Sequence, residues 1–351
     1  MILIGYLSHR KNPRTVKQAY YFAVAAQKEN AEFLFFSPKG IDIANRKING
    51  YILVKNQWKK VERRFPDVIF NHGNPGKMAH SQAKIDVLKQ EIPFTSHSIG
   101  SKMTVYYRLK EAKTFSEYLI PSITVYSPKD VLNALNKYKK IVFKPNDGHK
   151  GIGVTFIDKL PKGYSVKVDH QKFIYNEAQL MRFVKQRIRG KKHLIQPCIN
   201  SKTRYGVPFD LRLHVQKDGN GEWKVALIYA RVARNNSFVT NLSSGGSRVP
   251  IEKFLRQQYP KEYSAMKKRL ERFALDLARH MDEIQQQVHS ETLDELGIDI
   301  GIDQNKHFWI YEVNWRPGLP HALFGKVGAE RTMIQYTIYL AKQHKSHLNN
   351  R

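Results

Sequence analysis

The sequence predicts a mixed α/β protein that is divided into two or three domains. The chain has 351 residues, and chains of this length usually fold into more than one domain, each with its own hydrophobic core. Hydrophobic residues make up 41% of it, which is enough for globular packing. Strand patterns alternate with helix patterns near the N-terminus, whereas later strand patterns are paired across turn-forming residues. The first arrangement is typical of a parallel sheet and the second of antiparallel hairpins.

Residues 1–95 are expected to form a small N-terminal α/β domain. Apolar strand patterns occupy residues 2–7, 31–36 and 68–70, and a helix pattern fills residues 17–27. Strands that alternate with helices favour a parallel sheet, because the connection between parallel strands is usually a helix.

Further helices are expected at residues 102–113, 176–187 and 261–288. The longest of them carries apolar residues at helical spacing from Met266 to Ile284. We interpret this stripe as part of a core and not as a cofactor site.

Residues 209–216 alternate cleanly between polar and apolar side chains, which predicts a strand with one core face and one cleft face. The core side chains are Leu211, Leu213 and Val215, and the cleft side chains are Asp210, Arg212 and His214. The turn signal at residues 218–221 and the strand pattern at 223–233 complete a hairpin.

A second hairpin is predicted near the C-terminal end. Turn-forming residues 303–306 join strand patterns at 297–303 and 308–314. Symmetrical closure of this turn places residue 299 opposite residue 310.

In that register Asp299, Glu312 and Asn314 share one face of the hairpin. The other face, suited to a core, holds Ile298, Ile300, Tyr311 and Val313. Two carboxylates and an amide oxygen on one face suit a magnesium ion bound together with substrate phosphates. An ordinary hairpin with a solvated acidic face would use the same residues, so the pattern alone leaves both interpretations open.

A glycine-rich loop follows an apolar strand pattern that ends at Lys144. Its glycines are Gly148, Gly151 and Gly153, and it also contains Lys150. Glycines let backbone N–H groups approach phosphate oxygens, and the lysines add positive charge. The loop leads to a strand and not a helix, so it is not a Walker loop. A glycine-rich turn without a ligand remains the alternative.

Together these motifs resemble the ATP-grasp superfamily, in which a strand lysine, a glycine-rich loop and a distal Asp…Glu-x-Asn hairpin occur in this order. The gap of 312 − 299 = 13 residues also fits. Within the superfamily, the sequence most resembles the YheC/YheD-type family, described as endospore coat-associated. The resemblance is carried by residues 35–38, 66–71, 209–218, 239–246 and 312–314.

The resemblance implies an ATP-grasp fold of two subdomains that clamp a nucleotide. The ATP-grasp domain would span residues 96–345, with the clamping subdomain at about 140–200. The N-terminal α/β domain would precede it, and residues 346–351 would form a frayed tail. ATP and Mg²⁺ are the cofactors that this fold implies, and Asp299, Glu312 and Asn314 are the expected metal ligands.

The resemblance also assigns residues to the nucleotide and to the substrate. Nucleotide-binding residues are Lys102, Lys144, Gly148, Lys150, Gly151, Gly153, Gln196, Cys198 and Ile199. Substrate-binding residues are Asn241, Ser243, Gly245, Gly246 and Arg316. Catalytic residues are Lys144, Arg212 and Arg231, because a fixed guanidinium fork suits phosphate geometry. A structural pair between Asp210 and Arg212 is the competing interpretation.

Residues 193–199 would be the adenine hinge, where backbone N–H and C=O groups read the base edge. Pro197 lacks the N–H and removes one donor. Cys198 is expected to be a packing residue and not a nucleophile, because no histidine stands at motif spacing.

The formal net charge is +29 and the pI is near 10.0, which predicts attraction to polyanions. Charged side chains that are spread over helix faces often only keep the surface hydrated. Alternatively, the positive charge binds an acidic substrate, nucleic acid or an anionic polymer. Nucleic acid is disfavoured, since no zinc finger or RNA-recognition signature occurs. An acidic acceptor would place Arg231, Arg234, Arg248 and Arg316 around the mouth of the site.

We expect a cytoplasmic protein, which the resemblance also links to the spore. The single cysteine excludes an internal disulfide, and no long uncharged run resembles a membrane span. The leading hypothesis is an ATP- and magnesium-dependent ligase that activates a carboxylate of a small-molecule, peptide or polymer acceptor. A spore-coat scaffold without turnover and a polyanion-binding protein are the alternatives.

Overall fold

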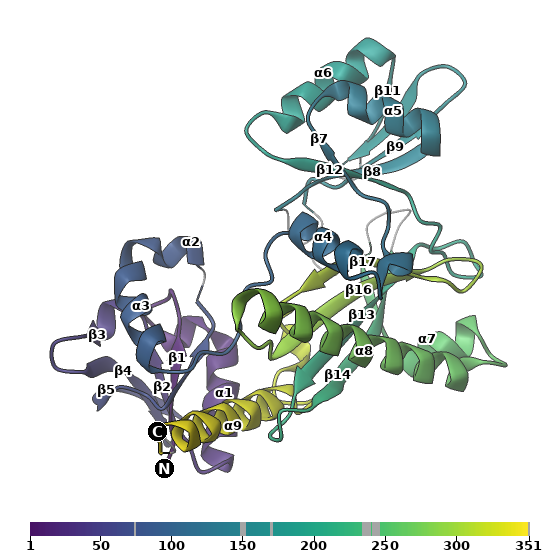
Figure 1. The fold of residues 1–351 in the computed structure, drawn as a ribbon. Helices are drawn as coiled ribbons and strands as arrows, with labels where there is room; N and C mark the ends of the chain where they lie inside the picture. The colour runs from purple at the N-terminus through teal and green to yellow at the C-terminus, as the bar shows by residue number, and fades with distance from the viewer. Residues whose placement is uncertain (74, 148–151, 169–170, 234–239, 241–245, 350–351) are drawn as a thin grey trace.

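The computed structural model describes residues 1–73, 75–147, 152–168, 171–233, 240 and 246–349. Figure 1 shows three α/β lobes: an N-terminal lobe, a central lobe, and a clamp lobe that lies above the central one. Each lobe is built on its own sheet and has its own hydrophobic core. This mixed α/β architecture confirms the predicted fold class.

The N-terminal lobe has six strands in the order β3-β4-β2-β1-β6, with β5 paired to β4. They are β1 (Leu3–Leu7), β2 (Glu32–Phe36), β3 (Ile41–Asp42), β4 (Lys47–Val54), β5 (Gln57–Arg64) and β6 (Val68–Asn71). Strand β1 runs parallel to both β2 and β6, as the alternation of strands and helix predicts. Helix α1 (Lys17–Lys28) contributes to the core on one face of the sheet, and α3 (Gln82–Glu91) to the core on the other.

The C-terminal helix α9 (Ala329–Asn349) also packs on the N-terminal lobe. Its Met333, Ile334 and Ala341 join the core cluster that contains Phe22 of α1. The helix continues through residues 346–349, which were expected to belong to a frayed tail. The partner of α9 lies some 300 residues upstream, and periodicity in the helix itself does not reveal such a contact.

The clamp lobe (residues 123–197) carries a sheet in the order β11-β10-β9-β8-β12-β7. Its strands are β7 (Ile123–Val125), β8 (Lys140–Pro145), β9 (Thr155–Lys159), β10 (Tyr164–Val168), β11 (Gln171–Tyr175) and β12 (His193–Pro197). Helices α5 (Pro128–Tyr138) and α6 (Glu177–Ile188) complete its core. Because β7 and α5 belong to it, this lobe begins earlier in the chain than the predicted residue 140.

The central lobe has five antiparallel strands in the order β15-β14-β13-β16-β17. They are β13 (Phe209–Lys217), β14 (Trp223–Val232), β15 (Ser247–Pro250), β16 (Glu295–Ile302) and β17 (Phe308–Asn314). Helices α4 (Lys102–Ala112), α7 (Ile251–Gln258) and α8 (Tyr263–His289) bury apolar side chains against one face of this sheet. Leu211, Leu213 and Val215 lie in that core, so the polar side chains of β13 point to the opposite face.

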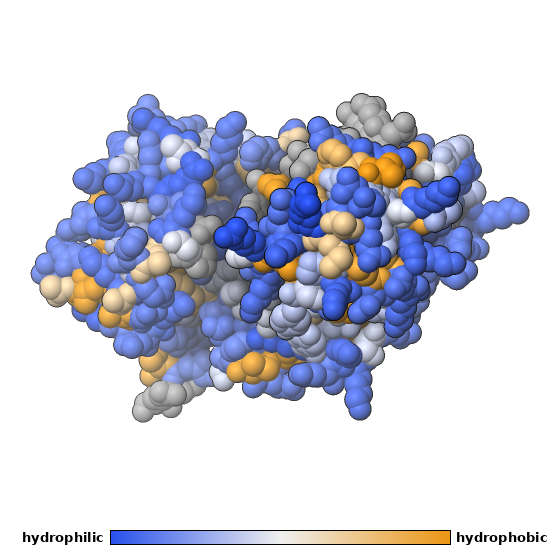
Figure 2. Space-filling view, turned by 90° about the horizontal axis from the view of Figure 1, so that it is seen from above, coloured by the Kyte–Doolittle hydropathy of each residue, from blue (hydrophilic) through white to orange (hydrophobic). Residues whose placement is uncertain are grey.

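Within the described ranges, no helix combines the length and apolar character needed to cross a bilayer. Hydrophilic side chains cover most of the face seen in Figure 2, and hydrophobic ones form small scattered groups. Short connecting helices in the N-terminal lobe and after β17 are α2 (Pro75–Met78) and the 3₁₀ turns Pro13–Thr15, Pro38–Gly40, Ala79–Ser81 and His321–Leu323. A further 3₁₀ turn, Ser116–Tyr118, follows α4.

Candidate nucleotide and metal site

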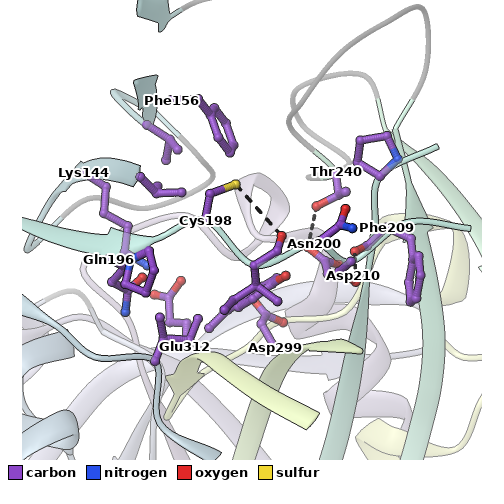
Figure 3. Close-up of a pocket in the computed structure, with 18 of the residues that line it drawn as sticks. Lys144, Phe156, Gln196, Cys198, Asn200, Phe209, Asp210, Thr240, Asp299 and Glu312 are labelled. Atoms are coloured by element: carbon purple, nitrogen blue, oxygen red, sulfur yellow. Dashed lines mark hydrogen bonds between the residues drawn. The ribbon is translucent and has the colours of Figure 1, made fainter. Parts of the chain in front are cut away.

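A cavity of about 460 Å³ lies between the clamp lobe and the central lobe. Strands β8 and β9 and the chain leaving β12 form one wall, and β13, β14, β16 and β17 form the other. Figure 3 shows Lys144 and Phe156 on the clamp side, facing Asp210, Asp299 and Glu312 on the central side. The volume lies in the range of small-molecule and cofactor sites.

Part of the cavity lining is apolar and suits a flat base. Its side chains are Ile120, Val142, Ile152, Val154 and Phe156. Three predicted hinge residues, Gln196, Cys198 and Ile199, border the cavity. The backbone N–H of Cys198 already donates to the Lys140 carbonyl at 3.1 Å, so it is not available to a base edge.

Burial raises the pKa of the Cys198 thiol above its ordinary value. The side chain is therefore protonated at neutral pH and is a weak nucleophile. This agrees with the interpretation of Cys198 as a packing residue.

Lys144 projects from β8 toward the polar end of the cavity. Burial lowers its pKa to about 8, with Lys102 acting in the same direction and Glu312 and Asp299 opposing. Within the described chain its ammonium group forms no ion pair, and an incoming phosphate would supply one.

Four charged side chains form a network on the polar face of the central sheet. Asp299 accepts hydrogen bonds from Arg212 through both carboxylate oxygens, and its Oδ2 lies 3.1 Å from Arg231 Nη2. Arg231 Nε donates to Asp210 Oδ1 at 2.5 Å, and Thr240 donates to Asp210 Oδ2. The competing interpretation, a pair between Asp210 and Arg212, is therefore wrong. Asp210 pairs with Arg231 of β14, and Arg212 pairs with Asp299 of β16.

Burial alone would raise the pKa of Asp299, but Arg212 and Arg231 hold it below its ordinary value. Burial keeps the pKa of Asp210 raised in spite of Arg231. The pKa of Arg231 is raised, because Asp299 and Asp210 outweigh its burial. Asp299 is thus a fixed anion at neutral pH, held between two fixed cations.

Asp299 and Glu312 lie directly opposite each other on β16 and β17. The predicted pairing of residue 299 with 310 is wrong, because the turn closes so that Ile310 pairs with Ile300. A bulge between Asp299 and Ile300 then shifts the register by one more residue, which places Asp299 opposite Glu312. The two carboxylates still share one face and both border the cavity.

The bulge also moves Tyr311, which was expected on the core face. Its side chain borders the cavity and covers Gly301, where a Cβ atom would overlap the Tyr311 hydroxyl. Ile310 takes the core position instead.

The oxygens of Asp299 and Glu312 fit a magnesium ion that is shared with phosphate. Hard oxygen donors on adjacent strands are the ligands that Mg²⁺ uses together with phosphates and water. Glu312 is the more accessible, with 28% of its side chain exposed and Oε1 lying 3.3 Å from Lys102 Nζ. Asn314 follows on the same strand, opposite Gly297, and does not border the cavity.

Lys102 stands at the N-terminus of α4, which Ser101 caps through a capping box. Its Nζ lies 3.3 Å from Glu312 Oε1 and 3.3 Å from the Asn146 carbonyl. Lys102 and Lys144 therefore line the same cavity.

The described cavity wall has more positive than negative side chains. Lys102, Lys140, Lys144, Lys202 and Arg231 face Asp210, Asp299 and Glu312. The excess of two positive charges suits a phosphate-bearing anion.

Several predicted residues lie outside the described part of the chain: Gly148, Lys150, Gly151, Asn241, Ser243, Gly245 and Arg234. Gly153 is described and has a φ of +74°, a conformation that favours glycine. Gly246 directly precedes β15.

Two of the four arginines assigned to the expected basic rim, Arg231 and Arg316, do not lie exposed at the mouth of the cavity. Arg231 is buried in the carboxylate network, and Arg316 is half-buried and donates to the Gly73 carbonyl. Arg248, on edge strand β15, is exposed.

Sequence reasoning missed the cavity residues Lys140, Phe156, Lys202, Thr240 and Tyr311. Alternation along the strand that ends at Lys144 could have identified Lys140 as its neighbour on the same face. Thr240 sits in a loop and Tyr311 follows from a bulge, and neither has a periodic signal.

Comparison with known proteins gives a family and a fold. A family model described as YheC/D like ATP-grasp matches residues 91–344. The chain is 24% identical to "Endospore coat-associated protein YheC" of Bacillus subtilis (strain 168), over 97% of this chain and 95% of that protein. It is 26% identical to "Endospore coat-associated protein YheD" of the same strain, over 84% of this chain and 68% of that protein.

Similar solved structures are ligases and synthetases. D-alanyl-alanine synthetase A from Vibrio cholerae matches with a TM-score of 0.54 and 13% identity, over 100% of this chain and 99% of that one. A Chryseobacterium gregarium RiPP-associated ATP-grasp ligase, in complex with ADP and a leader and core peptide, gives a TM-score of 0.51 and 13% identity over 98% and 97%. Because both sequence identities are only 13%, these matches show a shared fold, the ATP-grasp fold, and no more than that.

Proposed function

The chain belongs to the YheC/D-like ATP-grasp family, and from this premise we propose that it is an ATP- and magnesium-dependent ligase. A substrate carboxylate oxygen attacks the γ-phosphorus of ATP, the bond to the β-phosphate oxygen breaks, and ADP leaves. An amine, or a similar nucleophile, then attacks the acyl carbon of the acyl phosphate, and inorganic phosphate departs with that carboxylate oxygen.

The observation that carries this proposal is the placement of Asp299 opposite Glu312 in a cavity that also contains Lys144. Phosphoryl transfer requires mainly positioning and neutralisation of charge. Magnesium, when bound by Asp299 and Glu312, supplies neutralisation at the phosphate oxygens. A protein that served only as a scaffold would have no need for this arrangement.

Lys144 and the arginines have distinct parts in this proposal. Lys144 holds a phosphate oxygen from the clamp side, where its ammonium group forms no ion pair within the described chain. Arg231 lies in the cavity wall and stabilises charge on the transferred phosphoryl group. Arg212 acts through Asp299, which it holds in place with two hydrogen bonds.

The acceptor class is supported by the names of similar proteins. One structural neighbour is the D-alanyl-alanine synthetase described above. The peptide complex described above is another. We infer that the acceptor is an amino acid or a peptide and that the protein acts in the cytoplasm. The names of its two relatives, which are endospore coat-associated, support a link to the endospore.

The test is release of ADP from ATP and magnesium with panels of carboxylates and amines. The proposal expects ADP release that requires a carboxylate and is lost in Glu312→Gln. ATP-induced thermal stabilisation without any turnover would favour the nucleotide-binding scaffold instead.

A further inference from the structure

A second cavity, of about 670 Å³, lies between helix α9 and the hairpin that joins β13 to β14. It is larger than the nucleotide cavity, and its volume lies in the range of small-molecule sites. Glu29, which directly follows α1, also lines it. Asp218 in this cavity is eight residues from Asp210 in the nucleotide cavity, which is about 27 Å along an extended strand. The second cavity is therefore separate from the proposed reaction site.

This cavity has a buried floor, an exposed mouth and closely packed walls. Gln216 and Ala329, on the floor, are 2% and 1% exposed, whereas Asn220 at the mouth is exposed. Gly221 has a φ of +80°, and a Cβ atom there would lie 2.9 Å from Tyr339 Cε1. The hairpin can approach α9 this closely because the residue is glycine (Figure 1). Packing between the two elements therefore fixes the shape of the cavity.

Among the described residues, the charges that line this cavity cancel. Two carboxylates, Glu29 and Asp218, and two ammonium groups, Lys224 and Lys342, border it. Asp218 pairs with Lys224 at 2.5 Å, and Glu29 pairs with Arg331 at 2.5 Å. The nucleotide cavity, in contrast, has more positive than negative side chains. A balanced lining, whose carboxylates are already paired, favours an uncharged ligand over an anion or a cation.

The uncharged polar groups of the lining can both donate and accept hydrogen bonds. They are the side-chain amides of Gln216, Asn220 and Gln335 and the hydroxyls of Thr332 and Tyr339. Gln216 Oε1 is buried and has no hydrogen-bond partner among the residues that the structure describes. A buried acceptor without a partner is costly, so the floor of the cavity favours a ligand that can donate a hydrogen bond.

Apolar side chains lie among these polar groups. Val225, Ala226, Val327 and Ile338 also border the cavity. A sugar without charged groups matches this mixture, because each of its hydroxyls is both donor and acceptor and its ring has apolar C–H faces. A phosphorylated or cationic metabolite would instead add a charge that the paired carboxylates and lysines do not balance.

We propose that this second cavity is a binding site for an uncharged sugar. The amides of Gln216 and Asn220 and the hydroxyl of Tyr339 bind the sugar hydroxyls, and Val225 and Ile338 contact its C–H groups. A bound sugar bridges α9 and the β13–β14 hairpin. The site does not depend on the ligase reaction, since a protein without turnover would have the same cavity.

The experiment measures sugar binding to the full-length protein by calorimetric titration. Glucose, maltose and N,N′-diacetylchitobiose are the uncharged probes, and glucose 6-phosphate and glucosamine are the charged ones. We expect at least one uncharged probe to bind with a Kd of about 1 mM or lower. Each charged probe should bind at least tenfold more weakly than the best uncharged one. Saturating magnesium and ADP should leave the affinity for the sugar unchanged, because the two cavities are separate.

A double variant tests the location of the site. Asn220→Ala with Tyr339→Phe removes two polar groups from the lining and keeps the ring that packs on the hairpin, so the best probe should bind at least tenfold more weakly. The matched control is Asn305→Ala with Tyr126→Phe. Asn220 and Asn305 are both exposed in hairpin turns, where their backbone N–H donates to an aspartate Oδ1 at 2.9 Å, and Tyr126 is exposed on the clamp lobe. The control should bind the sugar as the wild-type protein does.

Failure of every uncharged probe to bind would overturn the sugar site, and so would tighter binding of either charged probe. Loss of sugar binding in the presence of ADP would place the sugar in the nucleotide cavity. Unchanged affinity in the folded double variant would also contradict the proposal. If the double variant does not fold, Asn220→Ala and Tyr339→Phe are measured singly, and each should weaken binding at least threefold.

Discussion

Asp299 is the register partner of Glu312, and the bulge that follows Asp299 is what brings the two carboxylates opposite each other. The pair is asymmetric. Asp299 is buried and bound by two arginines, whereas Glu312 is more accessible and, among the described residues, forms an ion pair with Lys102 alone. Asp299 can therefore anchor the charge network, whereas Glu312 can exchange its lysine partner for a metal ion.

We predict that this asymmetry separates activity from stability. Both Asp299→Asn and Glu312→Gln should reduce magnesium-dependent ATP turnover by about 10²–10³-fold, since each removes a carboxylate that would hold the magnesium ion, and the ion neutralises the phosphate oxygens. Only Asp299→Asn should also destabilise the fold, by about 3–5 kcal/mol, because it leaves buried arginines without their partner.

Initial rates and denaturant unfolding of the two variants measure both effects. Unfolding should remain cooperative in each. Wild-type turnover in either variant would remove the metal assignment, and equal stability of the two variants would contradict the asymmetry.

Nucleotide affinity should fall as pH rises through about 8. Lys144 has a pKa of about 8 in the folded protein, so above this pH its amine is neutral and must take up a proton to bind phosphate. Calorimetric titrations with ADP should show up to about tenfold weaker binding per pH unit above 8. The heat should depend on the buffer, because a proton is taken up.

Lys144→Met should bind more weakly at pH 7 and lose this pH dependence. A stability effect of the same group has the opposite sign. Below pH 8 the buried ammonium group is a cost to folding, and that cost is relieved as pH rises from about 8 toward 10.5. An unchanged pH profile in Lys144→Met would show that another group titrates.

The C-terminal helix should be required for stability of the N-terminal lobe. Ile334 is fully buried in the cluster formed with α1, so Ile334→Ala should cost about 2–5 kcal/mol. His347→Ala, at an exposed position of the same helix, should change stability by less than about 0.5 kcal/mol. Denaturant unfolding measures the free energy of unfolding of both variants. Similar losses of stability in Ile334→Ala and His347→Ala would show that α9 does not belong to the core.

Local pattern predicted much of the fold. Periodicity located α1, α4, α6 and α8, and the buried stripe from Met266 to Ile284 is confirmed. The alternation in β13 correctly assigned Leu211 and Arg212 to opposite faces. These features depend on neighbours in sequence, which is why a single sequence reveals them.

Features that depend on distant packing were not predictable. The prediction assumed that the hairpin closes symmetrically. The bulge beside Asp299 breaks that symmetry, so the partner of Glu312 and the face on which Tyr311 lies both differ from the prediction. The pairing of Arg212 with Asp299 joins strands 87 residues apart. The docking of α9 needs an apolar surface that forms only when the N-terminal sheet has folded.

The fate of a carboxylate oxygen tests the central claim most directly. Full-length protein is incubated with ATP, magnesium, an amine panel and a tripeptide pool whose C-terminal carboxylates contain ¹⁸O. The ¹⁸O content of the inorganic phosphate is then measured by mass spectrometry. The account predicts one ¹⁸O atom per phosphate released with each ligated product, because the acyl carbon gives up that oxygen when the amine attacks. Ligated product accompanied by unlabelled phosphate, or by AMP, would contradict the acyl-phosphate mechanism.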